Sequence, residues 1–245
     1  MRVHVVNSAN RSQYLDEIEA MHRHRHRLFV ELMGWRALAS DDGLDIDEFD
    51  NQWATYLLAI DDDGVLRGSG RLVPSWRPHM LKNLFPEFSD TPAPVGPEIW
   101  EWTRHAPGDP LYSGTINKQV KSALHIGMLE FAASRGIEAF TGILETRLLG
   151  PVIESGWKIT PLGAPRDYGE GNAVGVVIRF APDFIDIARA RAGRSGPVLV
   201  EMPCGMPVDA RHLARRSVEL AMRLPLHALG EAVARLEPLV AGESF

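Results

Sequence analysis

Apolar residues recur along the chain at two spacings, which predicts a mixture of strands and helices. Short runs rich in β-branched and aromatic residues, bounded by glycine, proline or aspartate, predict seven strands. These runs lie at 2–6, 53–61, 65–74, 98–104, 138–145, 157–163 and 173–180. Asp-Asp-Asp-Gly joins the second and third runs, so we expect these two strands to form a hairpin.

Three other stretches show helical spacing. Polar residues at 7–13 precede a pattern that predicts a long helix to about Met33, ended by Gly34. A second helix is predicted by the spacing of Ile116, Val120, Leu124, Gly127 and Phe131, with its end at Arg135-Gly136. A short helix interrupted by Pro151 is expected at 146–156, and a loop with one helical turn at 75–98. Because strands and helices alternate in the later part, residues 1–182 are expected to form one α/β domain around a single sheet.

The pattern changes after Pro182. Residues 185–207 are irregular and partly basic, and two amphipathic stretches beyond them are separated by Pro225. We therefore expect residues 183–245 to be a C-terminal helical extension. A packing role is favoured for it, with docking or dimer formation as the alternative.

Composition and charge exclude several classes of protein. The chain has 245 residues, 45% of them hydrophobic, and a net charge of -6, so no overall positive field attracts nucleic acid or acidic lipid. No apolar run approaches the roughly 18 to 20 residues of a membrane span, and the N-terminus turns polar too early for a signal peptide. Cys204 is the only cysteine, which excludes an internal disulfide and a cysteine-based zinc site. We expect a cytoplasmic protein without nucleic-acid or membrane partners.

The stretch MHRHRHRLFVELMGW, residues 21–35, contains one residue out of place. On a helix with about 100° per residue, Arg25 falls on the apolar face, whereas Arg23 and Arg27 point into water. A metal site at His22 and His26 is disfavoured because the HExxH glutamate is missing and neighbouring arginines repel a cation. A buried guanidinium is costly unless carboxylates pair with it, so Arg25 requires acidic partners.

An acidic cluster that could supply them follows at Asp45, Asp47 and Asp50, just before a strand. Its D-x-D-x-x-D pattern also suggests calcium, but the central glycine and distal glutamate of an EF-hand are absent. Aspartates also gather in ordinary loops. Partners for the buried arginine, or a site for a cationic substrate, suit the spacing better.

These residues belong to an ordered series that resembles one known family. The series, Arg25-x-x-x-Phe29, Trp35, Asp47-x-x-Asp50, Arg71-Leu72-Val73-Pro74 and Glu101-x-x-Arg104, resembles that of acyl-homoserine-lactone synthases, the autoinducer synthases of bacterial quorum sensing. The resemblance covers about residues 1–180. It implies a three-layer α/β/α sandwich related to the GNAT acyltransferase fold. The glycine-rich phosphate loop of generic acetyltransferases is missing before the helix at 116, where the chain reads YSGTINKQ.

The resemblance also implies a reaction and roles for the residues. The family joins an acyl thioester to the amine of S-adenosylmethionine, which then closes to a lactone and releases methylthioadenosine. Both compounds are substrates, so no cofactor and no metal are expected. The residues expected to bind S-adenosylmethionine are Arg25, Phe29, Trp35, Asp47, Asp50, Arg71 and Arg104.

Glu101 is expected to accept the amine proton, with Arg71 and Arg104 beside it as further catalytic residues. Pairing of Glu101 with one of these arginines is the alternative. Strict alternation along a strand would send Glu101 and Arg104 to opposite faces, so both serve one site only if the strand bulges there.

The acyl donor is expected to be acyl-CoA. IWEWTR and GWKITPLGAP resemble the branch that makes isovaleryl- and coumaroyl-homoserine lactones, although Arg147-Leu148-Leu149 departs from it. Acyl carrier protein is the alternative donor. An acyl pocket is expected at Trp100, Trp102, Phe140 and Gly142, with sheet core as the alternative role of the aromatic side chains. Two other functions remain open, another N-acyl amino acid synthase and an inactive S-adenosylmethionine-binding sensor.

Overall fold

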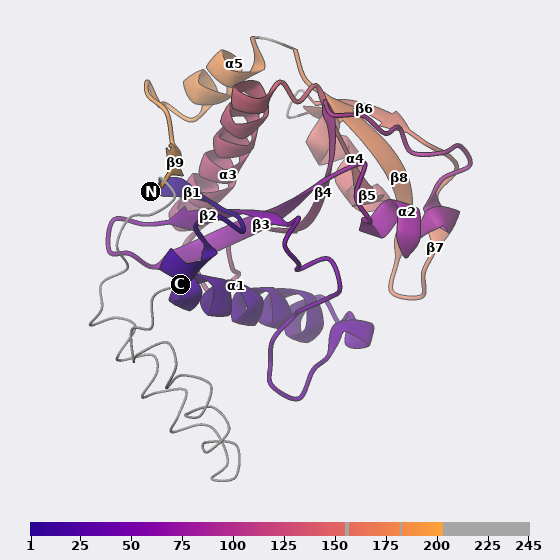
Figure 1. The fold of residues 1–245 in the computed structure, drawn as a ribbon, viewed down its shortest axis with the longest axis horizontal. Coiled ribbons are helices and arrows are strands. Elements are labelled where there is room, and N and C mark those ends of the chain that lie inside the picture. The colour runs from indigo at the N-terminus through magenta and orange to yellow at the C-terminus, as the bar shows by residue number, and fades with distance from the viewer. Residues whose placement is uncertain (155–156, 182, 203–245) are drawn as a thin grey trace, which may run out of the picture. The chain divides into compact units, whose positions relative to one another are not determined.

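The fold is built on one mixed sheet, seen in a computed structural model that describes residues 1–154, 157–181 and 183–202 (Figure 1). Within these residues the sheet has nine strands in the order β6-β8-β5-β4-β3-β2-β1-β9, with β7 paired to β8. The strands are β1 Arg2–Val6, β2 Thr55–Ile60, β3 Leu66–Pro74, β4 Ile99–Ala106, β5 Ala139–Glu145, β6 Lys158–Pro161, β7 Arg166–Asp167, β8 Asn172–Arg179 and β9 Leu199–Glu201.

Helices connect these strands. The α-helices are α1 Leu15–His26, α2 Met80–Asn83, α3 Gly114–Arg135, α4 Thr146–Glu154 and α5 Phe184–Arg191. Helix α1 continues as the π-helix η2 Arg27–Leu32, and the short 3-10 turns are η1 Arg11–Gln13, η3 Arg36–Leu38 and η4 Pro86–Phe88.

Both faces of the sheet are covered, which gives three layers. On one face α1 packs with Tyr56 and Leu58 of β2, and α2 packs over the β5 and β8 end of the sheet. On the other face α3 packs with Leu57 and Ala59, the alternate residues of the same strand, and α5 lies against α3 (Figure 1). Every residue of β2 is buried for this reason. The expected three-layer α/β/α sandwich is confirmed.

The sheet is divided at its centre, where β4 and β5 part. The two strands pair in parallel at only three positions, the last being Glu101 opposite Thr141. Beyond that point β4 remains paired with β3 and β5 with β8, so each strand belongs to a different half of the sheet. The backbones are still close at first, because a Cβ atom on Gly142 would lie 2.7 Å from the carbonyl oxygen of Trp102.

Most elements expected from the sequence are confirmed. The first long helix ends near Gly34 (φ +78°) and the helix α3 ends at Gly136 (φ +65°), both in the left-handed region that glycine enters at little cost. The hairpin of β2 and β3 and the helical turn in 75–98 are also present. Helix α4, by contrast, runs through Pro151 without interruption. A proline removes only one donor from the helical ladder, and α4 gains packing against β5 and β8.

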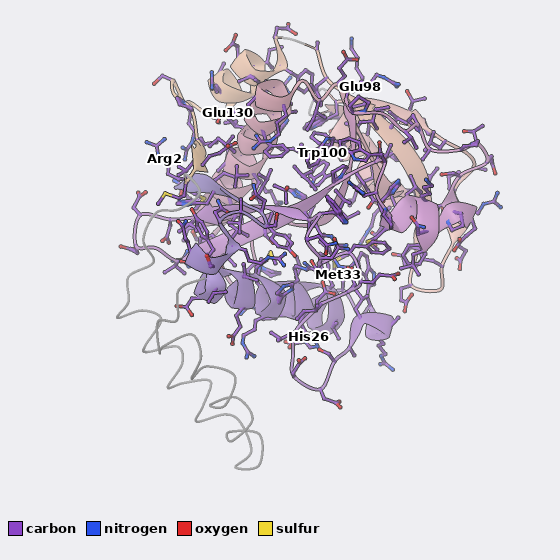
Figure 2. The ribbon with its side chains drawn as sticks, viewed as in Figure 1. Arg2, His26, Met33, Glu98, Trp100 and Glu130 are labelled. Atoms are coloured by element: carbon purple, nitrogen blue, oxygen red, sulfur yellow. The ribbon has the colours of Figure 1, made fainter. Side chains whose placement is uncertain are left out.

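Residues 183–202, the first part of the expected extension, join the sheet domain. Helix α5 packs on α3, and β9 pairs in parallel with β1. Glu130 of α3 holds this connection, since its carboxylate accepts hydrogen bonds from the backbone N–H groups of Val198 and Leu199 at 3.0 and 2.8 Å (Figure 2). The two helices expected further on, and Cys204, lie outside the described residues, so a helical extension there stays a prediction.

The contacts of Glu130 lead to a prediction about stability. Glu130→Ala should lower the free energy of unfolding by roughly 2–3 kcal/mol, since buried N–H groups that lose their acceptor cost about 1–3 kcal/mol each. Amide hydrogen exchange at Val198 and Leu199 should accelerate. Glu138→Ala, at an exposed position near the same end of α3, is the control and should change little. Equal losses in both variants would contradict the proposed anchoring of β9.

Candidate active site

Three buried arginines and three aspartates form one ion-pair network on the α1 face of the sheet. Arg25 comes from α1, Arg71 from β3 and Arg104 from β4. The aspartates lie in the loop before β2, at Asp45, Asp47 and Asp50. Its longest-range ion pair, Arg104 with Asp45, joins residues that are 59 positions apart in the sequence.

Arg25 is at the centre of this network, with 1% of its side chain exposed. Its Nη1 and Nη2 donate to Oδ1 and Oδ2 of Asp50 at 2.9 and 3.0 Å, a bidentate pair. Its Nε donates to Oδ2 of Asp45 at 2.8 Å. The expectation that Arg25 is buried and paired with carboxylates is confirmed.

Arg71 and Arg104 complete the network. Arg71 donates to both oxygens of Asp47, at 2.5 and 3.0 Å, and its Nη1 also lies 3.0 Å from Asp50. Arg104 donates to both oxygens of Asp45, at 2.9 and 3.2 Å, and its Nη2 lies 3.0 Å from Asp47. Because arginines bind all three carboxylates, the calcium interpretation of the acidic cluster is wrong.

The charges of the network balance each other. Burial alone would raise the pKa of Asp50, but Arg25 and Arg71 outweigh it and hold that pKa far below its usual range. Burial alone would lower the pKa of Arg25, yet Asp50 and Asp45 outweigh it and raise that pKa. The side chain of Asp47 is 18% exposed, against 1% for Asp50, so Asp47 is the carboxylate that faces outward.

A bulge in β4 brings Arg104 to this face. Arg71 pairs with Thr103, but Ser69, two residues earlier, pairs with Ala106, three residues later. Arg104 takes up the extra residue with φ +49°, a conformation that is uncommon for a side chain with a Cβ atom. Glu101 and Arg104 consequently lie on the same face, and the bulge expected from the sequence is confirmed.

Glu101 is completely buried and bound to the segment 79–81. Its Oε1 accepts hydrogen bonds from Leu81 N at 2.6 Å and faces His79 Nδ1 at 3.0 Å, and its Oε2 accepts from Met80 N at 3.0 Å. The alternative expectation, that Glu101 pairs with Arg71 or Arg104, is wrong, since both arginines are bound by the aspartates and Glu101 by this segment.

The binding of Glu101 by the segment 79–81 was not expected from the sequence, although one signal pointed to it. Helix α2 begins after His79, whose side chain does not cap its backbone N–H groups. A helix start without a capping serine, threonine, aspartate or asparagine needs an acceptor from elsewhere. Glu101 supplies that acceptor from the neighbouring strand.

Phe29 and Trp35 form an aromatic wall beside the arginines. Their rings are stacked with centroids 5.2 Å apart, and the Arg104 guanidinium lies 5.8 Å from the Phe29 ring. Trp35 also contacts the edge of Tyr168, whose hydroxyl donates to Glu145 at 2.6 Å. Burial and this hydrogen bond raise the pKa of Tyr168 to about 12, so the hydroxyl stays protonated.

Trp100, Trp102 and Phe140 pack on the opposite face of the sheet, in the core cluster shared with α3. The Trp100 ring contacts Phe131 at 5.6 Å, and the Trp102 ring contacts Phe140 at 6.4 Å and Trp157 at 6.2 Å. Gly142 lies against the Trp102 backbone. The expected acyl-pocket residues thus cluster together on the α3 face.

Two expectations for the histidine- and arginine-rich helix have different outcomes. Arg23 is half-exposed and pairs with Glu19 one turn earlier, as a solvated helix face requires. The expectation that Arg27 points into water is wrong, because its guanidinium pairs with the buried carboxylate of Asp109. The chain is π-helical from Arg27 onward, so the spacing of 100° per residue no longer applies.

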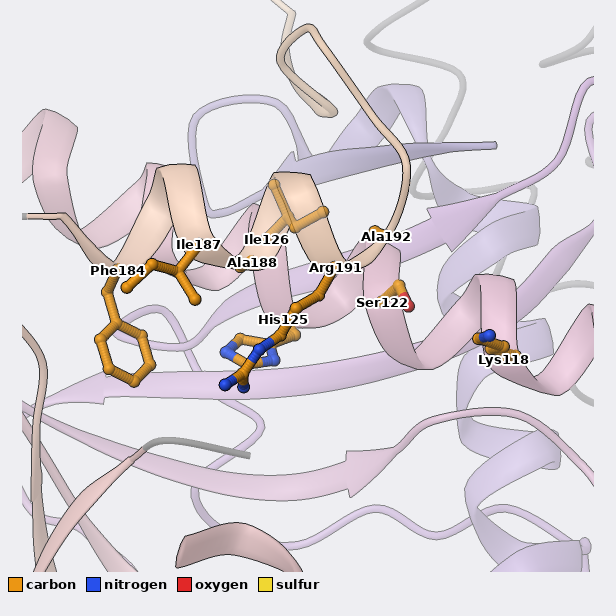
Figure 3. A pocket seen from close by; sticks show the side chains of 9 residues that line it. All are labelled: Lys118, Ser122, His125, Ile126, Phe184, Ile187, Ala188, Arg191 and Ala192. Carbon is orange, nitrogen blue, oxygen red and sulfur yellow. The ribbon is translucent and has the colours of Figure 1, made fainter. Parts of the chain in front are cut away.

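Two further observations concern other kinds of site. Among the described residues there is no cluster of three or more His, Cys, Asp or Glu placed to hold a metal ion, and no helix long and apolar enough to cross a membrane. A cavity of about 230 Å³ lies between α3 and α5, lined by Lys118, His125 and Phe184 among others (Figure 3). His125 stacks on Trp157, and burial together with Arg191 lowers its pKa to about 4. This cavity is on the α3 face, away from the ion-pair network.

Known proteins are similar to this chain along most of its length. The autoinducer synthase family matches residues 9–183. The isovaleryl-homoserine lactone synthase of Bradyrhizobium diazoefficiens is 31% identical over 202 residues, which cover 82% of this chain and 90% of that protein.

Two solved structures have the same fold. BjaI, a CoA-dependent acyl-homoserine lactone synthase solved with SAM and isopentyl-CoA, has a TM-score of 0.75 and 29% identity, covering 87% of this chain and 98% of BjaI. MesI, also a CoA-dependent acyl-homoserine lactone synthase, has a TM-score of 0.71 and 32% identity, covering 81% of this chain and 99% of MesI. The chain therefore belongs to the autoinducer synthase family and is an acyltransferase enzyme of that family.

Proposed function

We propose that the protein transfers an acyl group from acyl-CoA to the α-amine of S-adenosylmethionine. The methionyl carboxylate then attacks the carbon next to the sulfonium, which forms the lactone and expels methylthioadenosine. The product is an acyl-homoserine lactone that serves as a quorum-sensing signal. Support for acyl-CoA as donor comes from BjaI and MesI, which are both CoA-dependent, and from BjaI with SAM and isopentyl-CoA.

The observation that carries this proposal is the balanced ion-pair network next to Glu101. S-adenosylmethionine carries a sulfonium, an ammonium and a carboxylate, so its site must present both signs of charge. Asp47, the outward-facing carboxylate, suits the cationic groups, and Arg71 and Arg104 beside it suit the carboxylate. The stacked rings of Phe29 and Trp35 offer a flat surface for the adenine.

The chemistry needs a proton acceptor but no protein nucleophile. A thioester is already activated, and a sulfonium is already a good leaving group. The amine must lose a proton as it attacks the thioester carbon, and the carboxylate proposed to take it, directly or through a water, is Glu101. The aromatic residues Trp100, Trp102 and Phe140 form the surface proposed for the acyl group. Both reactants are consumed as substrates, so the proposed reaction requires no cofactor.

The proposed donor can be tested directly. Purified protein with S-adenosylmethionine should release methylthioadenosine faster with a short branched or aryl acyl-CoA than with the matching acyl carrier protein. Mass spectrometry should identify the acyl-homoserine lactone. A preference for the carrier protein would refute acyl-CoA as the donor. Binding of S-adenosylmethionine without any turnover would indicate an inactive sensor.

The central arginine should matter for both stability and activity. Arg25→Ala should lower the free energy of unfolding by roughly 3–5 kcal/mol, because it leaves buried carboxylates without their partner. Methylthioadenosine release should be lost with it. The control Arg23→Ala removes an exposed pair and should cost at most about 0.5 kcal/mol. Comparable losses in the two variants would show that Arg25 acts as a surface residue.

Removing the charge of Glu101 should slow the reaction strongly. Glu101→Gln should reduce turnover roughly 10²–10⁴-fold, the usual contribution of a positioned base. Calorimetry should show S-adenosylmethionine binding changed much less, because the ion-pair network does not include Glu101. Binding lost in step with turnover would make Glu101 a substrate clamp, and full turnover would leave a water or a backbone carbonyl as the base.

A further inference from the structure

Among the described residues, His79 is the one ionisable side chain within hydrogen-bond distance of Glu101. The reaction proposed above gives it no role. It is fully buried, and its Nδ1 lies 3.0 Å from Oε1 of Glu101. Its other ring nitrogen, Nε2, is buried without a hydrogen-bond partner. A buried polar atom left in this way is uncommon and calls for an explanation.

The hydrogen bonds around Glu101 determine which nitrogen of His79 carries the proton. The backbone N–H groups of Met80 and Leu81 can only donate, so both Glu101 oxygens accept hydrogen bonds. As the proton acceptor of the proposed reaction, Glu101 is a carboxylate and has no proton of its own to donate. His79 Nδ1 faces one of these oxygens and must therefore donate to it. A neutral His79 is then the Nδ1–H tautomer, and Nε2 is an unprotonated acceptor.

This arrangement leaves one lone pair of the carboxylate free. Each carboxylate oxygen has about two acceptor positions. Leu81 N and His79 Nδ1 fill both positions of Oε1, whereas Oε2 accepts only from Met80 N. The single open position on Glu101 is therefore on Oε2.

We propose that His79 is a positioning residue for Glu101. Its Nδ1–H occupies Oε1 and fixes the plane of the carboxylate, so that the amine proton is accepted at Oε2. This inference rests on the proposed function, because it assigns His79 a part in the same proton transfer.

The segment that carries His79 is itself held in place. The sulfur of Met80 accepts hydrogen bonds from Arg71 Nη2 at 3.2 Å and from Arg104 Nη1 at 3.6 Å. On the other side, His79 N donates to Asn83 Oδ1 at 3.0 Å. The ion-pair network and Glu101 are thus connected through residues 79–81, and the imidazole has little freedom to move away from the carboxylate.

Two substitutions of similar size separate positioning from packing. In His79→Asn the side-chain amide can replace the Nδ1–H donor, whereas His79→Leu offers no donor. We expect kcat to fall about 10- to 100-fold in His79→Leu, as for loss of a hydrogen bond to a charged group, with KM for S-adenosylmethionine nearly unchanged. In His79→Asn, kcat should stay within about threefold of the wild type.

The tautomer gives a readout that does not depend on turnover. Nitrogen-15 NMR of the full chain at neutral pH, with the His79 signals assigned from His79→Asn, should show a protonated Nδ1. An unprotonated Nδ1 would overturn the proposal, as would full kcat in His79→Leu, equal losses in both variants, or a loss confined to KM. A wild-type protein without turnover would instead refute the proposed function, and the role of His79 in it, even if the tautomer is as expected.

Discussion

The burial of three guanidinium groups on one face of the sheet is the constraint on which the site depends. A buried charge is tolerated only with an opposite charge and satisfied hydrogen bonds. Arg25, Arg71 and Arg104 meet this requirement through Asp45, Asp47 and Asp50, at N–O distances of 2.5 to 3.2 Å. The loop before β2 is thereby fixed against α1, β3 and β4, so the same ion pairs stabilise the fold and build the site.

The irregularities of β4 have the same cause. Arg104 can reach the aspartates only because β4 bulges at that residue, with φ +49°. Backbone strain of this kind persists where surrounding contacts determine it, and here Asp45 and Asp47 do so. Glu101, three residues earlier, thus lies on the same face of the sheet as Arg104. It accepts hydrogen bonds from two backbone N–H groups of α2. One bulge therefore sets the relation between the charged network and the proposed base.

In the proposed reaction, each of the two substrates binds to a different face of the sheet. The polar face carries the network, Glu101 and the stack of Phe29 on Trp35, which suits a charged nucleoside compound. The face toward α3 carries Trp100, Trp102 and Phe140, which suits an acyl chain. Strand alternation places Trp100 and Trp102 on one side of β4 and Glu101 on the other. The parallel pairing of β4 and β5 ends at Glu101 and Thr141, in the same stretch of β4 that carries Trp100 and Trp102.

Much of this protein follows from its sequence, because it rests on local patterns. Apolar spacing predicts seven of the nine described strands and the two long helices. Glycine marks helix ends at Gly34 and Gly136, where a left-handed backbone is needed. The position of Arg25 on an apolar face predicts buried carboxylate partners, since an unpaired charge there would be too costly. Alternation along EIWEWTR even predicts the bulge, once Glu101 and Arg104 are assigned to one site.

Other features depend on contacts between segments far apart in the chain, and no local pattern contains them. Which aspartate binds which arginine, the binding of Glu101 by residues 79–81, and the pairing of Arg27 with Asp109 are decided only when the sheet and its helices assemble. The same is true of β9, since the carboxylate of Glu130 in α3 accepts the hydrogen bonds that hold Val198 and Leu199. The sequence alone determined which groups must be paired or capped. Tertiary structure decided their partners, because a hydrogen bond or an ion pair is satisfied by any donor or acceptor that the fold brings within reach.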